Sequence, residues 1–537
     1  MRKLLLLACV AIIALMPLMA LAEDAAKPKQ DAAAAVQPSA RAVDPSGSKT
    51  GNAADVTAAK PGNPTIAEIA DEVGKSKVAV NMVWVLITGF LVMFMQAGFA
   101  MVESGLTRAK NVAHTMAMNL MIYPLGMLGF YLCGFALMFG GVGALGTLGG
   151  FDGLSSEFTV TLFGKEFGLF GSKGFMLTGV YDVAVFAMFL FQMVFMDTTA
   201  TIPTGSMAER WKYSSFFVYG LLVGTIIYPI YGNWVWGGGW LSALGKNFAL
   251  GHGHVDFAGS SVVHMTGGVL AFVGAKMLGP RIGKYNADGS PNAIPGHNIA
   301  MAVIGTFILA FGWFGFNPGS TLAGTDLRIS VVAVNTMLAS ATGAVAATLW
   351  MWLVRTKKPD PSMMCNGLLA GLVAITAPSA FVSAGSAAII GLVAGVLVIE
   401  AAFFIERKLR VDDPVGAVAV HGVNGAWGVL AVGLFADGTY GEGLNGVAGT
   451  VKGLFYGDPS QFVAQLIGMG ANILYVGLLG YIVFKLIDLV IGNRVSPAAE
   501  VDGLDIPEMG VSGYSGIKLD KFSETPFSKG SAPAKAQ

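Results

Sequence analysis

The chain has 537 residues, of which 54% are hydrophobic and only 12% are charged, with a mean hydropathy of +0.64 and a formal net charge of zero. Soluble domains carry about 25% charged residues, so this composition excludes a soluble globular protein and indicates a polytopic membrane protein. The zero net charge gives no reason to expect nucleic acid or an acidic partner.

Residues 1–22 are typical of a secretory signal peptide. Arg2 and Lys3 form a basic start, an apolar run follows, and the sequence ALA at 20–22 supplies small residues for cleavage. Cleavage would leave the mature N-terminus outside the cytoplasm. Residues 23–76 are rich in Ala, Pro, Lys and Asp without periodicity, and we expect an extracytoplasmic extension that is disordered or loosely helical.

Residues 77–490 are predicted to form an all-α membrane domain with eleven apolar segments of spanning length. Eleven spans place the tail, residues 491–537, on the side opposite the N-terminus, which is the cytoplasm. The predicted spans are 78–102, 113–140, 182–204, 213–235, 257–279, 298–316, 329–354, 363–381, 384–404, 415–436 and 461–489.

The distribution of basic residues supports this number of spans and this orientation. The predicted cytoplasmic loops hold 13 Lys and Arg residues and the outside loops hold 5, which follows the positive-inside rule. The cytoplasmic set is Arg108, Lys110, Arg210, Lys212, Lys276, Arg281, Lys284, Arg355, Lys357, Lys358, Arg407, Lys408 and Arg410, and the outside set is Lys165, Lys173, Lys246, Arg328 and Lys452.

Two matching motifs divide the spans into halves. DFAGSSVVH runs from Asp256 to His264 in span five, and DPVGAVAVH runs from Asp413 to His421 in span ten. A repeat of five spans enters the membrane from the opposite side the second time, so we predict an inverted 5+5 repeat plus a final helix. About 12 Å of helix separates each aspartate from its histidine, which would carry both histidines toward the middle of the membrane.

Histidines at this depth are functional candidates, because a charged group there costs about 2.5 kcal/mol or more. A lone buried histidine is more often a satisfied core residue, but two at matching positions favour a pore. We expect His264 and His421 to be neutral, to hydrogen-bond together, and to meet a small neutral guest or relay a proton. A metal site is the rival interpretation, but it usually has at least three protein ligands. We therefore predict neither metal nor cofactor.

Aromatic residues gather near one end of this pore. Phe191 and Phe195 lie at i and i+4 on one face of span three, and Phe316 ends span six just before a helix break, with Ser320 beyond it. Aromatic stripes in membrane helices usually face lipid or the core. The grouping of these aromatic residues with Ser320 favours a binding function, because aromatic faces attract cations and a serine oxygen accepts a hydrogen bond.

Trp236 ends span four near the same mouth as Ser320 and Asp256. Alone it would be interpreted as an interfacial anchor. The carboxylate of Asp256 biases the local potential, so the three residues together describe a vestibule for a small cation, followed by a hydrophobic constriction.

Asp197 lies inside span three beside several threonines. The simplest interpretation is a polar contact, within or between helices, with Thr198, Thr199 or Thr201. The sequence does not choose among these three.

Several stretches resemble the ammonium transporters of the Amt/Mep/Rh superfamily across nearly all of residues 78–515. They are FMQAGFAMVESG with RAKN, FQMVFMDTTATIPTGSMAERW, VWGGGW, DFAGSSVVH, FGWFGFNPGS and DDPVGAVAVHGVNGAWG. The resemblance implies an eleven-helix fold, a homotrimer with one pore per subunit, and transport of ammonium or methylammonium across a bacterial inner membrane. The match at Trp236 and the FMQAGFAMVESG stretch place the chain in the Amt/Mep branch rather than the Rh branch.

The resemblance also implies roles for the candidate residues by position. It assigns the outer ammonium-recruitment site to Trp236, Ser320 and Phe191, with Asp256 as the carboxylate that mainly holds the structure of this vestibule. It assigns the phenylalanine gate to Phe195 and Phe316. It assigns the twin-histidine pair to His264 and His421.

The sequence departs from the family at several positions. Met196 and Asp197 stand where small residues are common. The segment before Asp256 looks long and contains His252 and His254. The tail GLDIPEMGVSGY has Met509 and Val511 where the family's regulatory pattern has a histidine and an acid. This change puts regulation by a PII-type signal protein in doubt.

The expected mechanism is recruitment of ammonium outside, loss of water and a proton near the gate, and passage of ammonia, because a neutral molecule crosses an apolar pore more cheaply than an ion. The alternatives are a Rh-like neutral ammonia channel and an ammonium sensor that signals through its tail, although this tail is too short for a kinase or cyclase. An enzyme is not expected, since the sequence offers no nucleophile–base pair and no metal set.

Overall fold

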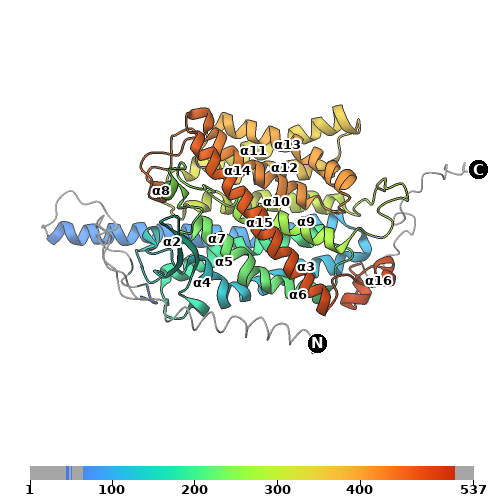
Figure 1. Cartoon of the computed structure of the whole chain (residues 1–537), viewed down its shortest axis with the longest axis horizontal. Coiled ribbons are helices and arrows are strands. Elements are labelled where there is room, and N and C mark those ends of the chain that lie inside the picture. Colours follow the sequence, from blue (N-terminus) through green and yellow to red (C-terminus); the bar gives the residue numbers. More distant parts are fainter. Residues whose placement is uncertain (1–43, 48–49, 51–63, 515–537) are drawn as a thin grey trace, which may run out of the picture.

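Long apolar helices run side by side along the longest axis of the molecule (Figure 1). The structure is a computed structural model that describes residues 44–47, 50 and 64–514. The predicted signal peptide and most of the predicted extension lie outside these residues. We call the end of the bundle that carries β1 (Glu157–Leu162), β2 (Lys165–Gly171) and α8 (Leu244–Phe248) the hairpin end, and the end that carries α16 (Pro497–Asp502) the tail end.

Helices form the bundle in the order expected from the sequence. The first half contains α2 (Pro64–Leu106), α3 (Val112–Gly129), α4 (Phe135–Phe139), α5 (Val183–Ser206), α6 (Tyr213–Leu222), α7 (Tyr228–Trp236), α8 (Leu244–Phe248) and α9 (Thr266–Leu278). The second half contains α10 (Ile299–Phe316), α11 (Ile329–Leu349), α12 (Pro361–Thr376), α13 (Ala384–Phe404) and α14 (Asn424–Phe435), followed by α15 (Pro459–Val490) and α16 (Pro497–Asp502).

Ten helical stretches within the described residues are long and apolar enough to cross a membrane. Each coincides with one of the predicted spans, and α12, with 16 residues, coincides with the remaining one. At 1.5 Å per residue α12 is about 24 Å long, which is shorter than a hydrocarbon layer of about 30 Å. The helix ends at Thr376 rather than at 381. The N–H of Ala377 donates to Ser260 Oγ at 2.7 Å instead of to the helix, and Pro378 has no N–H to continue it.

Helix α2 begins at Pro64, inside the stretch predicted to be a low-complexity extension, rather than near 78. Hydropathy marks where a helix leaves the apolar layer, and a helix can continue beyond that point. A salt bridge between Lys75 Nζ and Asp71 Oδ2, at 3.1 Å and with i,i+4 spacing, stabilises the charged N-terminal part of this helix.

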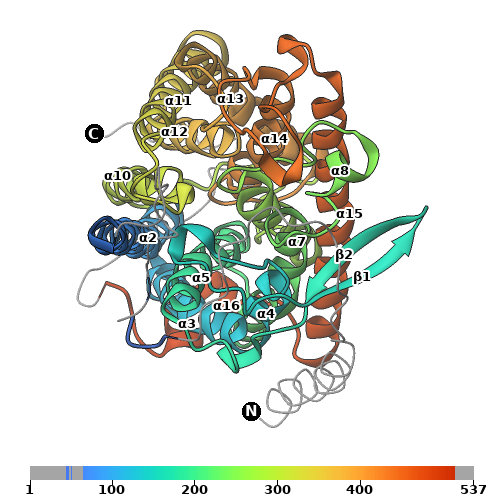
Figure 2. The same cartoon turned by 90° about the vertical axis from the view of Figure 1, so that its left-hand side faces the viewer.

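The two halves lie side by side, and α15 runs along the outside of both (Figure 2). Where α2 meets α10, Gly98 lies against the backbone oxygen of Gly305 and the side chain of Leu309, and Gly105 lies against the backbone of Ala302, so the two helices approach closely at both glycines. Small residues at such contacts are what allow membrane helices to pack closely.

A β-hairpin projects from the bundle beside α7 (Figure 2). It consists of β1 (Glu157–Leu162) and β2 (Lys165–Gly171), paired antiparallel. Asn233 of α7 donates to Glu157 Oε2 at 3.1 Å. Burial raises the pKa of Glu157 to about 8, and the hydrogen bond from Asn233 acts in the opposite direction. The hairpin thereby covers the end of α7, which carries Trp236.

Buried ion pairs join four loops at the tail end. Glu209 contacts Arg108 Nε at 2.5 Å and Arg281 Nη1 at 2.9 Å, and Arg281 Nε contacts Asp412 Oδ2 at 2.8 Å. Burial by itself would raise the pKa of Asp412, but the attraction of Arg281 and Arg210 lowers it below its usual range.

We predict that Asp412→Asn lowers the free energy of unfolding by about 3–5 kcal/mol, because it leaves Arg281 as a buried charge that has lost one partner. Since the folded pKa of Asp412 is depressed, its contribution is present above about pH 4 and is lost as the pH falls further. Thermal unfolding in detergent at pH 7 and at pH 3 measures both effects.

The matched control is Asp326→Asn, which removes a partly exposed pair with Arg328 and should cost less than about 1 kcal/mol. Equal effects of the two substitutions at pH 7 would contradict the prediction.

Candidate functional site

His264 and His421 meet in the interior of the bundle. Their Nδ1 atoms are 3.2 Å apart and their ring centroids 5.3 Å apart, and both side chains are buried. Only one hydrogen fits between two nitrogens, so one ring donates through Nδ1 and the other accepts. The first ring then presents an acceptor at Nε2 and the second presents a donor, and neither Nε2 has a protein partner among the described residues.

Each histidine lies on a π-helical turn at the start of its span. His264 belongs to η7 (Ser260–Met265) and His421 to η11 (Val418–Val423). In each turn a carbonyl that accepts a backbone N–H also accepts from a side chain: Thr266 Oγ1 donates to Ser261 O at 3.1 Å and Asn424 Nδ2 donates to Ala419 O at 2.9 Å. Such turns are frequent at functional sites, and the sequence pattern gave no indication of them.

The two aspartates of the repeated motif hold the first turns of these segments. Asp256 accepts from the backbone N–H groups of residues 259–262 and from the hydroxyl of Ser261, at 2.6–2.9 Å. Asp413 accepts from the backbone N–H groups of 415, 416 and 418. Both carboxylates are therefore engaged in the same local role in the two halves.

A glycine contact sets the separation of the histidine-bearing segments. A Cβ atom built on Gly268 would lie 2.1 Å from the backbone nitrogen of Gly422 and 2.8 Å from the carbonyl carbon of His421. No residue with a Cβ fits at 268 unless the two backbones separate.

Aromatic rings form a column that ends on the histidine pair. The centroids of Phe195 and Phe316 are 4.2 Å apart and Phe191 is 4.7 Å from Phe195. Phe316 in turn lies 5.2 Å from the ring of His264, and Trp313 stacks on that ring at 5.1 Å. The structure thus brings together the residues predicted for the gate and for the histidine pair.

Trp236 and Ser320 lie at the hairpin end of this column, and both are half-buried. The indole Nε1 of Trp236 donates to the backbone oxygen of Asp256 at 2.6 Å, and its ring meets Phe195 edge-on at 6.1 Å. The hydroxyl of Ser320 donates to Phe316 O at 2.7 Å, which leaves its oxygen lone pairs to accept. The carboxylate of Asp256 points into its own helix turn, so it fixes the mouth rather than facing it.

Asp197 and His254, to which the sequence assigned no role in the pore, lie outside the ring column. The hydroxyls of Thr198, Thr199 and Thr201 donate to partners other than Asp197, and Asp197 Oδ1 is buried without a partner among residues 64–514. The expected threonine contact is therefore wrong. His254 contacts the hydroxyl of Ser261 through Nε2 at 3.0 Å, outside the ring column.

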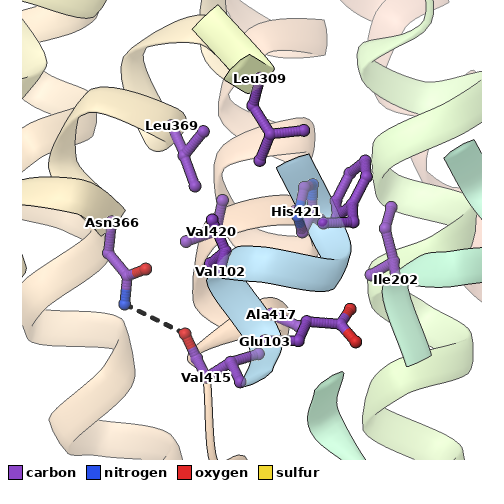
Figure 3. A pocket seen from close by; sticks show the side chains of 11 residues that line it. Val102, Glu103, Ile202, Leu309, Asn366, Leu369, Val415, Ala417, Val420 and His421 are labelled. Atoms are coloured by element: carbon purple, nitrogen blue, oxygen red, sulfur yellow. Dashed lines mark hydrogen bonds between the residues drawn. The ribbon is translucent and has the colours of Figure 1, made fainter. Parts of the chain in front are cut away.

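A small cavity adjoins His421 (Figure 3), and its lining includes Val415 and Ala417, which precede the histidine in the chain on its tail side. Its volume is about 20 Å³ and its lining includes Phe99, Val420 and Glu103. The sequence gave no weight to Glu103, because an acid near a helix end and close to basic residues looks like an ordinary loop-edge charge. Among the residues the structure describes, no cluster of three His, Cys, Asp or Glu side chains is arranged to hold a metal ion.

The fold and the buried, ring-lined path define a polytopic membrane transport protein. Residues 83–514 match the profile of the Ammonium Transporter Family. The chain is 49% identical to ammonium transporter Amt2 of Archaeoglobus fulgidus, over 81% of this chain and 88% of that protein. It is 39% identical to ammonium transporter Amt1 of Haloferax mediterranei, over 81% and 79%.

Solved structures show the same fold. A structure titled "Sensor Amt Protein" matches with a TM-score of 0.70 and 36% identity, covering 80% of this chain and 98% of that one. Mep2 of Candida albicans matches with a TM-score of 0.65 and 26% identity, over 78% and 86%. The chain belongs to the Ammonium Transporter Family.

We predict that Gly268→Ala separates the two histidine segments, costs about 1–3 kcal/mol of stability through overpacking, and reduces ammonium transport at least tenfold. The matched control is Gly422→Ala, whose added Cβ would meet its nearest atoms at 3.4 Å or more, an ordinary contact. Thermal unfolding and uptake of labelled methylammonium measure the two variants. Equal behaviour of both would show that the close approach at Gly268 does not set the site.

Proposed function

We propose that the chain transports ammonium through the path from Trp236 to His421, recruiting the ion at the hairpin end and conducting ammonia past the histidines. The observation that carries this proposal is the unbroken series of ring contacts from a tryptophan mouth, through a phenylalanine constriction, to a histidine pair. Family membership supplies the substrate.

Recruitment uses the half-buried mouth. The ring of Trp236 and the face of Phe191 attract a cation by their quadrupoles, and the hydroxyl oxygen of Ser320 accepts a hydrogen bond from ammonium. Asp256 keeps the indole in place through its backbone oxygen.

Dehydration and deprotonation follow at the constriction. The rings of Phe195 and Phe316 are fully buried and in contact, so a passing ion would lose its water with no polar replacement. A neutral molecule pays far less for this step. Ammonia then reaches the two free Nε2 atoms, one an acceptor and one a donor, which suit a molecule that both donates and accepts.

The histidine pair also offers a path for the proton. Transfer across the Nδ1–Nδ1 contact exchanges the tautomers of the two rings, and a proton taken up at one Nε2 leaves from the other. Net movement of charge would follow if this relay operates, whereas a Rh-like channel would pass ammonia alone.

The cellular setting belongs to the same proposal. The bias of basic residues supports a cytoplasmic tail end and an outer hairpin end. The bacterial inner membrane is inferred from the resemblance to bacterial Amt proteins. Assembly as a homotrimer with one pore per subunit is inferred from the family. A PII-type protein at the tail end is a weak candidate partner, because Met509 and Val511 change the family's regulatory pattern.

Sensing of ammonium is the second candidate function. It is favoured by the likeness to the structure titled "Sensor Amt Protein", nearly all of which is covered by this chain. A pure sensor would bind ammonium without sustained flux, so the uptake of methylammonium by liposomes separates the two functions.

We predict that replacing both His264 and His421 with Ala lowers ammonium current at least tenfold or admits potassium, because the polar atoms that select the guest are lost. Currents on a solid-supported membrane after ammonium and potassium pulses measure this. The control is His252→Ala, a histidine whose Nε2 contacts Gly449 O away from the pore. Unchanged current and selectivity in the double variant would refute the assigned role.

We predict that Trp236→Leu raises the half-saturating ammonium concentration by about 2- to 30-fold, the equivalent of a cation–π contribution of about 0.5–2 kcal/mol. Transport currents across a series of ammonium concentrations provide the measurement. Trp352→Leu is the matched control, because Trp352 is exposed on the outside of the bundle. A recruitment site elsewhere is indicated if Trp236→Leu leaves this concentration unchanged.

A further inference from the structure

The cavity on the tail side of His421 joins the histidine pair to a buried carboxyl group. His421 and Glu103 both line it (Figure 3), and they are the two ionisable side chains among its lining residues. The volume of about 20 Å³ has room for one water molecule. One water in this space would have Glu103, His421 and Asn366 as the polar side chains around it.

Glu103 is held by side chains of two other helices. Asn119 of α3 donates to Oε2 at 2.7 Å, and the hydroxyl of Thr204 on α5 lies 2.9 Å from Oε1 and 2.7 Å from Oε2. Gly205 packs against the carboxyl, since a Cβ there would come within 3.1 Å of it. The carboxyl is fixed in place although it is almost fully buried.

The hydroxyl of Thr204 suits both charge states of Glu103. It lies between the carboxyl group and the backbone oxygen of Thr201, which is 2.5 Å away. A hydroxyl has one hydrogen and two lone pairs. It can donate to an ionised Glu103, or donate to Thr201 O and accept from a protonated Glu103, so the carboxyl can gain and lose a proton without a change of rotamer.

Joining the helices does not by itself require an acid at this position. Gln96 lies two turns earlier on α2 and links α3 and α5 with an amide, donating to Asn119 O at 2.8 Å and to Thr201 Oγ1 at 2.9 Å. An ionisable group within a membrane span is costly and is a functional candidate by default. The acid, unlike the amide, is the one that lines the cavity beside His421.

We propose that Glu103 is the proton acceptor on the tail side of the histidine pair, an assignment that rests on the proposed function. An N–H bond of ammonium breaks near the gate, and the proton passes through His264 and His421 and the cavity water to the Glu103 carboxylate. The carboxylic acid then gives this proton to ammonia leaving the pore, which forms ammonium again. One ammonium ion and one positive charge cross in each cycle, and Glu103 ends ionised as it began.

The test compares Glu103→Gln with the wild-type protein in liposomes. The amide keeps the size of the side chain and can still hydrogen-bond to Thr204 and Asn119, but it cannot carry a proton. We expect the ammonium current to fall at least tenfold while ammonia permeation, followed by internal alkalinisation, falls less than twofold. Glu103→Asp, which restores a carboxyl, should recover part of the current. The matched control is Glu157→Gln, which removes a buried carboxyl beside the hairpin and should leave the current unchanged.

The outcomes separate this proposal from the proposed function. A wild-type current with an equal current in Glu103→Gln overturns the role of Glu103 and leaves the transport proposal standing. Ammonia permeation with no current in the wild-type protein overturns both charge-coupled transport and the role of Glu103. A loss of current and of ammonia permeation in equal proportion indicates a blocked pore and also overturns the proposal.

A second variant serves if Glu103→Gln does not fold. Thr204→Val keeps the carboxyl but removes the hydroxyl that accommodates both charge states. We expect a current reduced at least threefold with ammonia permeation retained, and an unchanged ratio of current to permeation overturns the proposal.

Discussion

The contact between two imidazole rings is the constraint around which the rest of the structure is arranged. A single hydrogen between the Nδ1 atoms of His264 and His421 fixes opposite tautomers and directs two unlike Nε2 atoms to the same path. The contact needs both backbones at close range, which Gly268 permits. It also needs two rigid segments, and the aspartate at the start of each segment supplies that rigidity through several backbone hydrogen bonds. These hydrogen bonds are strongly favoured inside a membrane, because no water is present to replace them.

The surroundings of the pair divide the molecule into an apolar side and a polar side. Toward the hairpin end the path is lined by aromatic rings, and Trp313 and Phe316 lie against His264. Toward the tail end it meets Glu103 and a network of amides and hydroxyls between α2, α3 and α5. A charge is therefore disfavoured on one side of the histidines and has polar partners on the other. This asymmetry gives the direction in which a proton released at the constriction can be stabilised.

Much of this arrangement could be predicted from the sequence, because it is carried by local motifs. The all-α membrane fold and the family were predicted and are confirmed, and the meeting of the two histidines follows from the spacing of the repeated motif. The π-helical turns could not be predicted, since the runs SSVVHM and VAVHGV carry no residue that distinguishes a π turn from an α turn. Glu103 was missed because its burial depends on Asn119 and Thr204, which come from other helices. The start of α2 at Pro64 was missed because hydropathy indicates which residues lie inside the apolar layer of the membrane and not where the helix itself begins.

The ion pairs at the tail end have a consequence for how the protein is made. Arg281 and Asp412 are 131 residues apart in the chain. At about 5–20 residues per second, ribosomes need roughly 7–26 s to synthesise that interval. During this time Arg281 has emerged and can pair with Glu209, but its second carboxylate does not yet exist. The cluster of ion pairs can therefore be completed only after most of the second half has been synthesised.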